Sequence, residues 1–317
     1  MRINAFKGNG KFYKGNLHCH TTVSDGKLSP EDTAAAYKAK GYDFLAITDH
    51  RTFNTDTSFG GDELLIIPGM ELDGNFQKEF QGESMWACHH IVVVDPGEGF
   101  PGKPFEHGEK FDSVKDPDCK VVYNGMKDIF KDRRCVAIYA HPKWSRVSYE
   151  DLADLEGFFA MEIYNGACYF WGNIAESDYH LDMMLRNGKS VNAVASDDNH
   201  HTYQIGQGWI CVKADALTQK DIMTNIIEGN YYSSSGPEIK DIYVEDNKVH
   251  VECSPCRAIH MARFNYPGRS VVSFDDELLT HAEFDLGEIK PNQPLLYIRI
   301  ECEDERGKKA WSNPIKF

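Results

Sequence analysis

Nine histidine and carboxylate residues stand out because their types suit metal ions and because they recur beside apolar runs. The stretch NLHCHTTVSDGK (16–27) holds His18 and His20 one residue apart, with Asp25 five residues later. The other candidates lie further along the chain and are His50, Glu71, His90, His141, Asp198 and His200. Imidazole and carboxylate without matched cysteine pairs favour Zn, Mn or Fe. Because these ligands exceed one coordination sphere, the sequence predicts two to three divalent ions.

Short apolar runs alternate with helical segments over the first three quarters of the chain. The expected strands are 15–20, 42–48, 63–72, 89–95, 135–142, 158–165 and 190–197. The clearest helix should begin at Pro30 after an N-cap at Ser29 and end before Gly41. Repeated strand and helix predict a parallel sheet, and seven repeats favour a closed barrel. Because strand ends meet at one mouth of such a barrel, the candidate ligands should converge there.

The side-chain alternation of an extended chain places His18 and His20 on one face, where both can contact one ion. The same argument does not decide which residue faces the centre in three pairs of neighbouring candidates, here called doublets. A shift of one residue in strand register reverses the face of every side chain. These doublets are His89 and His90, Asp197 and Asp198, and His200 and His201.

In order and spacing, these motifs resemble those of the PHP (polymerase and histidinol phosphatase) family over roughly residues 12 to 235. The HxH motif with its following acidic ligand matches His18, His20 and Asp25, and the TDH motif matches Thr48 to His50. The remaining motifs match Glu71, His90, the HP pair at His141, and the D-x-H of Asp198 and His200. The resemblance implies a distorted seven-stranded (β/α) TIM-like barrel that usually holds a trinuclear metal site.

The resemblance also implies how the ligands are shared among the ions. One ion would be held by His18, His20, Glu71 and Asp198; a second by His90, His141 and the shared Glu71; and a third by Asp25, His50 and His200. The family often has histidine where this chain has Asp25, and both side chains are compatible with a metal.

The predicted activity is that of a metal-dependent phosphoesterase. Three divalent ions and three carboxylates would leave about +3 charges in the mouth, which suits a phosphate monoester dianion. A metal-bridging hydroxide at the di- or trinuclear site would attack phosphorus, since coordination lowers the pKa of bound water towards ~7. Arg51, Lys143 and Arg146 are candidate phosphate contacts, with solvated surface charge as the alternative for each.

Two other functions stay open: a phosphodiesterase or 5′ to 3′ exonuclease acting on nucleotides or short oligonucleotides with the same metal cluster, and a non-catalytic protein that binds through its C-terminal β domain. A related amidohydrolase is a remote alternative. The net charge of −15 argues against long nucleic acids and anionic membranes as partners. The expected partner is a small phosphorylated substrate, with a nucleotide as one option, and the oligomeric state stays open.

Residues 1–236 are expected to form the barrel and residues 237–317 a small all-β sandwich, because the later strands have no helices between them. The CSPC stretch (253–256) is only a weak redox or zinc signal, because no partner pair accompanies it. Residues 95–120, rich in Pro and Gly, predict a long surface insertion, either a plain loop or a flap over the mouth.

The amino-terminal residues lack the apolar run of an export signal, and no stretch approaches the ~18 apolar residues of a membrane span. Nine scattered cysteines, an odd number, do not predict a disulfide framework. A cytoplasmic location is therefore expected, with an exported protein whose signal peptide has been removed as the alternative.

Overall fold

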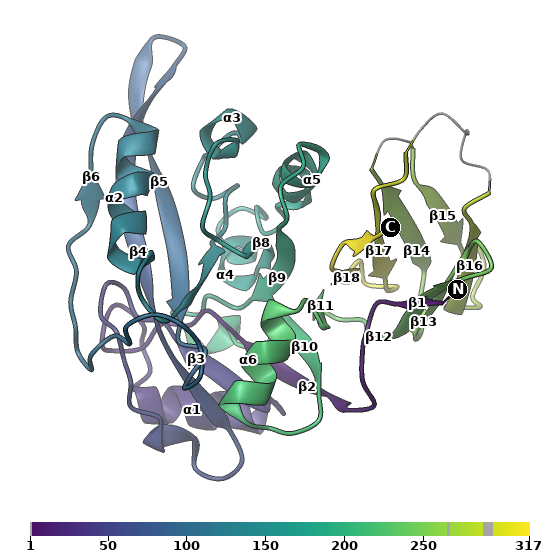
Figure 1. Ribbon diagram of the computed structural model, residues 1–317, viewed down its shortest axis with the longest axis horizontal. Coiled ribbons are helices and arrows are strands. Elements are labelled where there is room, and N and C mark those ends of the chain that lie inside the picture. The colour runs from purple at the N-terminus through teal and green to yellow at the C-terminus, as the bar shows by residue number, and fades with distance from the viewer. Residues whose placement is uncertain (1, 265–266, 288–293) are drawn as a thin grey trace.

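The computed structural model describes residues 2–264, 267–287 and 294–317. They form a mixed α/β lobe and an all-β lobe (Figure 1). The α-helices are α1 (Pro30–Ala39), α2 (Cys119–Phe130), α3 (Tyr149–Leu152), α4 (Gly166–Phe170), α5 (Asp178–Arg186) and α6 (Gln219–Ile227), with 3-10 turns at η1 (Ser58–Gly60) and η2 (Thr202–Gln204).

A large mixed sheet forms the frame of the α/β lobe. In the order in which they pair, its strands here are β11 (Tyr231–Ser234), β10 (Trp209–Ala214), β2 (Lys11–Asn16), β3 (Phe44–Ile47), β4 (Leu65–Phe80), β5 (Glu83–Val94), β7 (Val136–Tyr139), β8 (Ala160–Asn165) and β9 (Asn192–Ser196). The short strand β6 (Val114–Lys115) pairs with β4. Each expected strand is thus present, although several bounds differ.

The predicted all-parallel, closed barrel is not what the strands form. The ladders β2 to β4 and β7 to β9 are parallel, whereas β4–β5, β5–β7 and β2–β10 are antiparallel. Within the described ranges, no ladder connects β9 back to the other end of the sheet, so the sheet stays open.

The hairpin of β4 and β5 explains the difference. Its two-residue turn, Gln81 and Gly82, has φ of 53° and 84°, the left-handed pair that matches the twist of a tight hairpin. The outer half of the hairpin is more exposed than the inner half and extends beyond the rest of the lobe (Figure 1). The sequence analysis expected only the two apolar inner halves, and read them as separate parallel strands.

Helix α1 confirms its sequence prediction at both ends. The Ser29 side chain accepts a hydrogen bond from the Asp32 backbone N–H, and Pro30 occupies the first turn. Gly41 follows the helix with φ of 73°, a conformation that glycine adopts at little cost.

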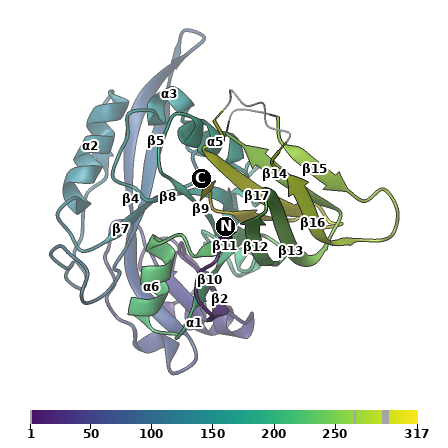
Figure 2. The same ribbon diagram turned by 45° about the vertical axis from the view of Figure 1, so that its right-hand side comes forward.

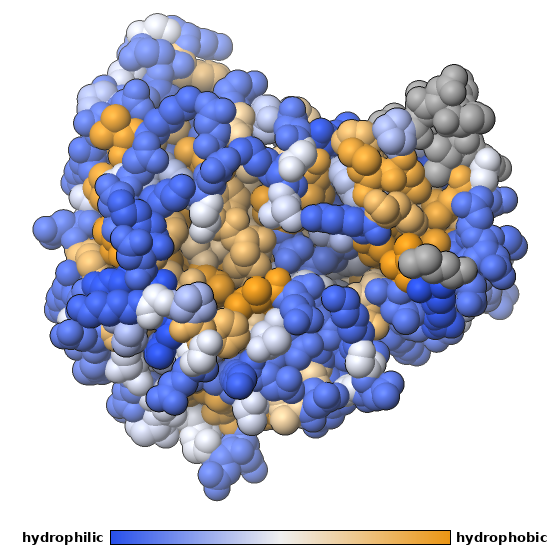
Figure 3. Space-filling view, viewed as in Figure 1, coloured by the Kyte–Doolittle hydropathy of each residue, from blue (hydrophilic) through white to orange (hydrophobic). Residues whose placement is uncertain are grey.

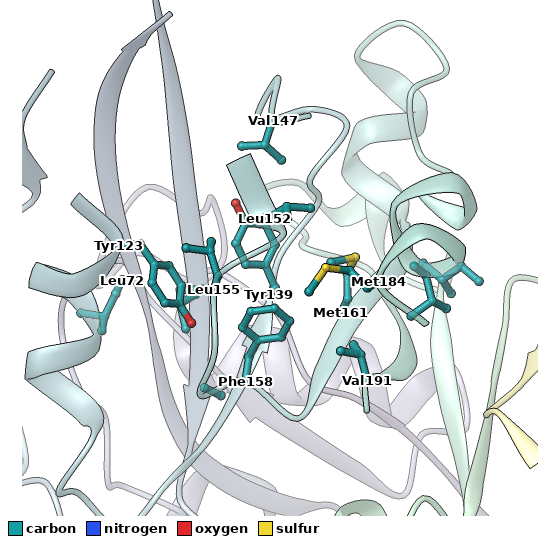
Figure 4. Close-up of a cluster of buried hydrophobic side chains, with 14 of the residues drawn as sticks. Leu72, Tyr123, Tyr139, Val147, Leu152, Leu155, Phe158, Met161, Met184 and Val191 are labelled. Atoms are coloured by element: carbon teal, nitrogen blue, oxygen red, sulfur yellow. The ribbon is translucent and has the colours of Figure 1, made fainter. Parts of the chain in front are cut away.

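A cluster of buried side chains fixes the central strands against the helices. Tyr123 of α2, Tyr139 of β7 and Met161 of β8 are essentially inaccessible to solvent and pack near Phe158 (Figure 4). Burial of each such side chain stabilises the fold by about 1.5–3 kcal/mol. This packing holds the strand ends that carry the candidate ligands in fixed positions.

The all-β lobe has two facing sheets (Figure 2). One contains β1 (Ile3–Asn4), β12 (Ile239–Glu245), β13 (Lys248–Cys256) and β16 (Leu279–Asp285). The other contains β14 (Ala258–Arg263), β15 (Arg269–Val272), β17 (Tyr297–Glu303), β18 (Lys309–Ser312) and β19 (Ile315–Lys316). Because β18 pairs with β11, the large sheet continues across the lobes. The amino-terminal strand β1 pairs with β12 of the other sheet, and the division after residue 236 stays a prediction.

The insertion at 95–120 is anchored beside the segment that follows His50. Phe105 is buried and stacks on Phe53, with 4.5 Å between ring centroids. The Phe53 backbone N–H donates to the Glu109 carbonyl at 2.9 Å, and the Gly108 N–H donates to the Phe53 carbonyl at 2.8 Å.

No helix in the described ranges has both the length and the apolar character to cross a bilayer.

Candidate metal centre

Glu71, near the middle of β4, is the centre on which the predicted ligands converge. Its side chain is only 1% exposed. The Glu71 Oε1 atom lies 2.8 Å from His90 Nδ1, 3.2 Å from His18 Nε2 and 3.3 Å from His141 Nε2. Its other oxygen, Oε2, lies 3.0 Å from His50 Nδ1 and 3.4 Å from His20 Nε2. One carboxylate thus contacts five imidazoles, which come from four segments of the chain.

Backbone contacts with β4 position His50. The Glu71 N–H donates to the Asp49 carbonyl at 3.2 Å, and the Arg51 N–H donates to the Glu71 carbonyl at 2.7 Å. The Asp49 carboxylate accepts hydrogen bonds from the backbone and hydroxyl of Thr21, each at 2.8 Å. Asp49 therefore fixes the loop between His20 and Asp25.

Asp198, just after β9, is the second buried carboxylate. Its Oδ1 lies 3.0 Å from His20 Nε2 and 3.2 Å from His18 Nε2. Asn165 donates to the other oxygen, Oδ2, at 3.1 Å. Asp198 has φ of 49° and His141 has φ of 27°, a strained conformation for residues other than glycine that is common at functional sites.

Asp25 lies at the open edge of the centre, with its side chain 54% exposed. Its Oδ1 is 3.4 Å from His200 Nε2 and 3.7 Å from His20 Nδ1, and its Oδ2 is 3.7 Å from His50 Nε2. Partial burial opposes ionisation, but the hydrogen bond and charge of His200 hold the pKa of Asp25 below its usual range. The pKa of His200 rises to about 9, since burial is outweighed by Asp25.

The electrostatics of the buried ligands favour exchange of protons for cations. Burial alone would raise the pKa of Glu71, but His90 and His18 hold it well below its usual range. Burial likewise opposes protonation of His18, whereas Asp198 and Glu71 raise its pKa well above the ordinary value. A cation that binds these carboxylates would therefore displace imidazole protons.

The structure shows which member of each doublet faces the centre. His90, Asp198 and His200 face the centre, as the resemblance implied. His89 lies on the opposite face of β5, where its Nδ1 is 2.5 Å from the Tyr139 hydroxyl and burial lowers its pKa to about 4.

The other members of the doublets have structural contacts. The Asp197 carboxylate accepts hydrogen bonds from three successive backbone N–H groups, of residues 206 to 208, at 2.6 to 2.9 Å. His201 stacks on Tyr203, with 5.2 Å between ring centroids. Neither side chain contacts the centre.

Glu162, the third residue of β8, is a buried carboxylate that contacts two of the candidate ligands and to which the sequence analysis gave no role. Its Oε1 lies 2.8 Å from His18 Nδ1, and its Oε2 accepts from the His141 backbone at 2.9 Å and from Asn165 at 2.8 Å. A carboxylate on one ring nitrogen fixes the orientation of an imidazole and directs the other nitrogen towards a metal. Its place within the expected strand 158–165, three residues before Asn165, was the signal in the sequence.

The ligand atoms fit divalent cations. Asp198 Oδ1 and His50 Nδ1 are buried, and neither forms a well-aligned hydrogen bond with a described residue. Their close polar neighbours are other members of the centre, His20 Nε2 and Glu71 Oε2, each at 3.0 Å, and a shared cation would satisfy these atoms. His18 Nε2 and His20 Nε2 face one another at 3.1 Å. Groups whose ligand atoms lie within 4.8 Å of one another include His18, His20 and Asp198; His18, Glu71 and His141; His50, Glu71 and His90; and His20, Asp25, His50 and His200. Because these groups share members, they suit a multinuclear centre rather than isolated sites.

A cleft of about 520 Å³ opens beside the centre. Lys143 and Arg146 line it together with Trp86, Trp144 and Trp171. The Trp144 ring lies 4.9 Å from the His141 ring, and the Trp171 ring lies 5.8 Å from the His200 ring. Apolar residues also gather in the hollowed middle of the face shown in Figure 3.

The predicted phosphate contacts differ in their availability. Arg51 forms an ion pair with Asp73, so part of its charge is already neutralised. Lys143 is exposed and forms no ion pair with any residue that the structure describes, and Arg146 contacts the Trp86 carbonyl at 3.4 Å. Lys143 is therefore the best placed of the three to bind an anion.

Replacing Glu162 with Gln should weaken metal binding by about 10- to 100-fold while the fold is retained, because the His18 imidazole loses its orienting charge. Competition with a chelator would measure the affinity. Glu156→Gln is the matched control, since the Glu156 side chain is 72% exposed and, among the residues that the structure describes, forms its ion pair with Lys189 at 3.4 Å. Equal affinities in both variants would refute the positioning role.

No protein-family model matches the chain. The solved structures with similarity to it include PHP-like metal-dependent phosphoesterases and a nuclease. One is a two-domain protein from Bacteroides vulgatus described as containing a predicted PHP-like metal-dependent phosphoesterase, with 11% identity, 99% of both chains covered and a TM-score of 0.46. Another is the lesion-specific endonuclease PfuEndoQ from Pyrococcus furiosus, with 12% identity over 69% of this chain and 57% of that chain and a TM-score of 0.41.

Two curated proteins share short segments with the chain. A 5′-3′ exoribonuclease of Haemophilus influenzae is 37% identical over 73 residues, which are 20% of this chain and 25% of that protein. The DNA polymerase/3′-5′ exonuclease PolX of Bacillus subtilis is 50% identical over 40 residues, which are 13% of this chain and 7% of that protein. The chain thus matches a quarter or less of the length of either relative.

Proposed function

We propose that the chain is a PHP-family hydrolase that cleaves phosphate monoesters at a centre of two to three divalent cations, Zn, Mn or Fe. The observation that carries this proposal is the convergence of five imidazoles on the buried Glu71 carboxylate beside Asp198. When bound, the ions would lower the pKa of coordinated water and offset negative charge on phosphate oxygens.

The buried and the exposed side chains of the centre would have different roles. Glu71 and Asp198 are within 4 Å of several imidazoles each, so they would hold adjacent cations close together. Glu162 keeps the His18 ring in place through its 2.8 Å contact. Asp25, which is exposed, would complete the part of the centre that faces the substrate.

The cleft beside the centre would bind the rest of the substrate. Lys143 and Arg146 bring positive charge to a chain whose net charge is −15, and could hold non-bridging phosphate oxygens. The low overall basicity favours a small phosphorylated molecule over a long nucleic acid.

A second candidate function is hydrolysis of phosphodiesters in nucleotides or short oligonucleotides. The observation that favours it is the aromatic lining of the cleft: Trp86 is 51% exposed, Trp171 is 43% exposed, and Trp144 lies 5.9 Å from Trp171 between ring centroids. Exposed aromatic rings stack on nucleobases without sequence preference, at about 1–3 kcal/mol per base.

Lys143→Ala should raise KM for a phosphate monoester by about 3- to 10-fold and leave kcat within about twofold, because Lys143 would contact phosphate in both ground and transition states. Steady-state kinetics would measure both parameters. Lys220→Ala, an exposed lysine on α6, is the control. A large fall in kcat with unchanged KM would contradict simple phosphate binding.

The function is tested with protein stripped of metal and reloaded separately with Zn²⁺, Mn²⁺ or Fe²⁺. Each form is assayed on p-nitrophenyl phosphate, bis(p-nitrophenyl) phosphate and a short single-stranded oligonucleotide. Metal-dependent hydrolysis of the monoester supports the first candidate, and faster hydrolysis of the diester or oligonucleotide supports the second. Absence of hydrolysis with every metal and substrate would overturn both.

A further inference from the structure

Three cysteines form a separate cluster in the core of the all-β lobe. The Sγ atoms of Cys253, Cys256 and Cys302 all lie within 4.8 Å of one another. All three side chains are inaccessible to solvent. The first two lie on β13 and the third on β17 of the facing sheet, so the cluster bridges both layers of the lobe (Figure 2).

An irregularity in β13 places the first two thiols on the same side. In a regular strand, residues three apart face opposite sides of the sheet. Between Glu252 and Cys256 the chain advances four residues, whereas the paired strand advances two, from His281 to Leu279. Within this irregular stretch Cys253 is buried, Pro255 is exposed and Cys256 is buried, so the alternation slips by one residue and both thiols face the interior.

The third thiol comes from a distant part of the chain. Cys302 is paired with Ile259 across the β14–β17 ladder, and β14 begins two residues after Cys256. The chain therefore crosses from one sheet to the other at the CSPC stretch, where it meets Cys302. The sequence analysis rated CSPC a weak signal because no partner pair accompanies it, and the fold brings a third thiol, Cys302, beside it.

We propose that Cys253, Cys256 and Cys302 together bind one thiophilic d¹⁰ cation, Zn²⁺ or Cu⁺, that connects the two sheets of the all-β lobe. Thiolates are soft ligands that select these ions. With Zn–S bonds of about 2.3 Å, tetrahedral geometry places sulfur atoms roughly 3.8 Å apart, so the thiols need only small movements to become ligands. Binding releases the thiol protons and involves no change of oxidation state.

This site is independent of the proposed phosphoesterase centre. Its donor set is sulfur alone, whereas the centre around Glu71 offers nitrogen and oxygen. A metal there would stabilise the folded lobe, since the unfolded chain does not preform the three-thiolate arrangement. Loss of the thiol site should therefore affect stability before it affects hydrolysis.

Cadmium tests the proposal, because thiolate coordination gives an ultraviolet charge-transfer band that histidine and carboxylate ligands lack. The full-length, metal-stripped protein is titrated with Cd²⁺, and the band should saturate when about one ion per chain is bound to sulfur. Zn²⁺ and Cu⁺ are then added in separate samples, and the Cd²⁺ released into solution is measured by elemental analysis. The ion that releases Cd²⁺ at the lower concentration binds the three thiolates more tightly.

Cys256→Ser and Cys302→Ser should each reduce the band by more than half, whereas Cys135→Ser, a partly buried thiol outside the cluster, should leave it unchanged. The absence of a band in the unsubstituted protein would overturn the proposal without any variant. A disulfide between two of the three cysteines, found by mass spectrometry after alkylation of freshly isolated protein, would also overturn it. So would a folded Cys256→Ser variant with a full band.

Discussion

Glu71→Gln is expected to reduce hydrolysis of p-nitrophenyl phosphate by about 10³-fold or more, an effect at least as large as that of His20→Ala. The amide has nearly the same shape but removes the negative charge on which His18, His50 and His90 converge. Without that charge, adjacent cations are no longer held together against their mutual repulsion. A thousandfold loss corresponds to about 4 kcal/mol of transition-state stabilisation.

Steady-state kinetics with added metal would measure the effect, and elemental analysis would show whether at least one ion is lost. Glu79→Gln is the matched control, because it makes the same change at an exposed position of β4. Near-normal kcat in folded Glu71→Gln protein would mean that this carboxylate does not hold the ions.

His20→Ala is expected to reduce activity by about 10²- to 10³-fold and to weaken metal binding. His20 is completely buried, and its two ring nitrogens face different groups: Nε2 lies 3.0 Å from Asp198, and Nδ1 lies 3.7 Å from Asp25. In the proposed centre, removal of the imidazole would deprive one ion of a ligand and leave a space beside Asp25. The apolar side of the segment, with Leu17 and Cys19, is unaffected.

His201→Ala is the control for this substitution, since His201 stacks on Tyr203 instead of facing the centre. It should keep metal content and turnover close to those of the unsubstituted protein. If folded His20→Ala protein retained normal turnover and metal content, the HxH motif would have no catalytic role.

The convergence of the candidate ligands could be predicted from sequence, because each candidate belongs to a short motif beside an apolar strand. His18 and His20 share a face through local alternation, which survives although β2 ends at Asn16 and the two histidines follow it. The choice between the two members of each doublet could not be made from strand alternation. Only the resemblance selected His90, and its physical reason is the register of β5, in which His90 pairs with Asp73.

The features that sequence reasoning missed depend on contacts between distant segments. The direction of β5 is set by the Gln81–Gly82 turn and by pairing with β7, neither of which follows from apolar periodicity. The role of Glu162 depends on a contact 144 residues away in sequence. Cys302 likewise meets the CSPC stretch only because β14 and β17 pair.

Elemental analysis of freshly purified, metal-reconstituted protein tests the central claim most directly. The Cys256→Ser variant is used so that the cysteine cluster contributes little to the metal count, and Glu71→Gln is compared in the same background. We predict two to three equivalents of Zn, Mn or Fe per chain, with at least one lost when Glu71 is replaced. Less than one equivalent in the protein that retains Glu71 would contradict a multinuclear metal centre.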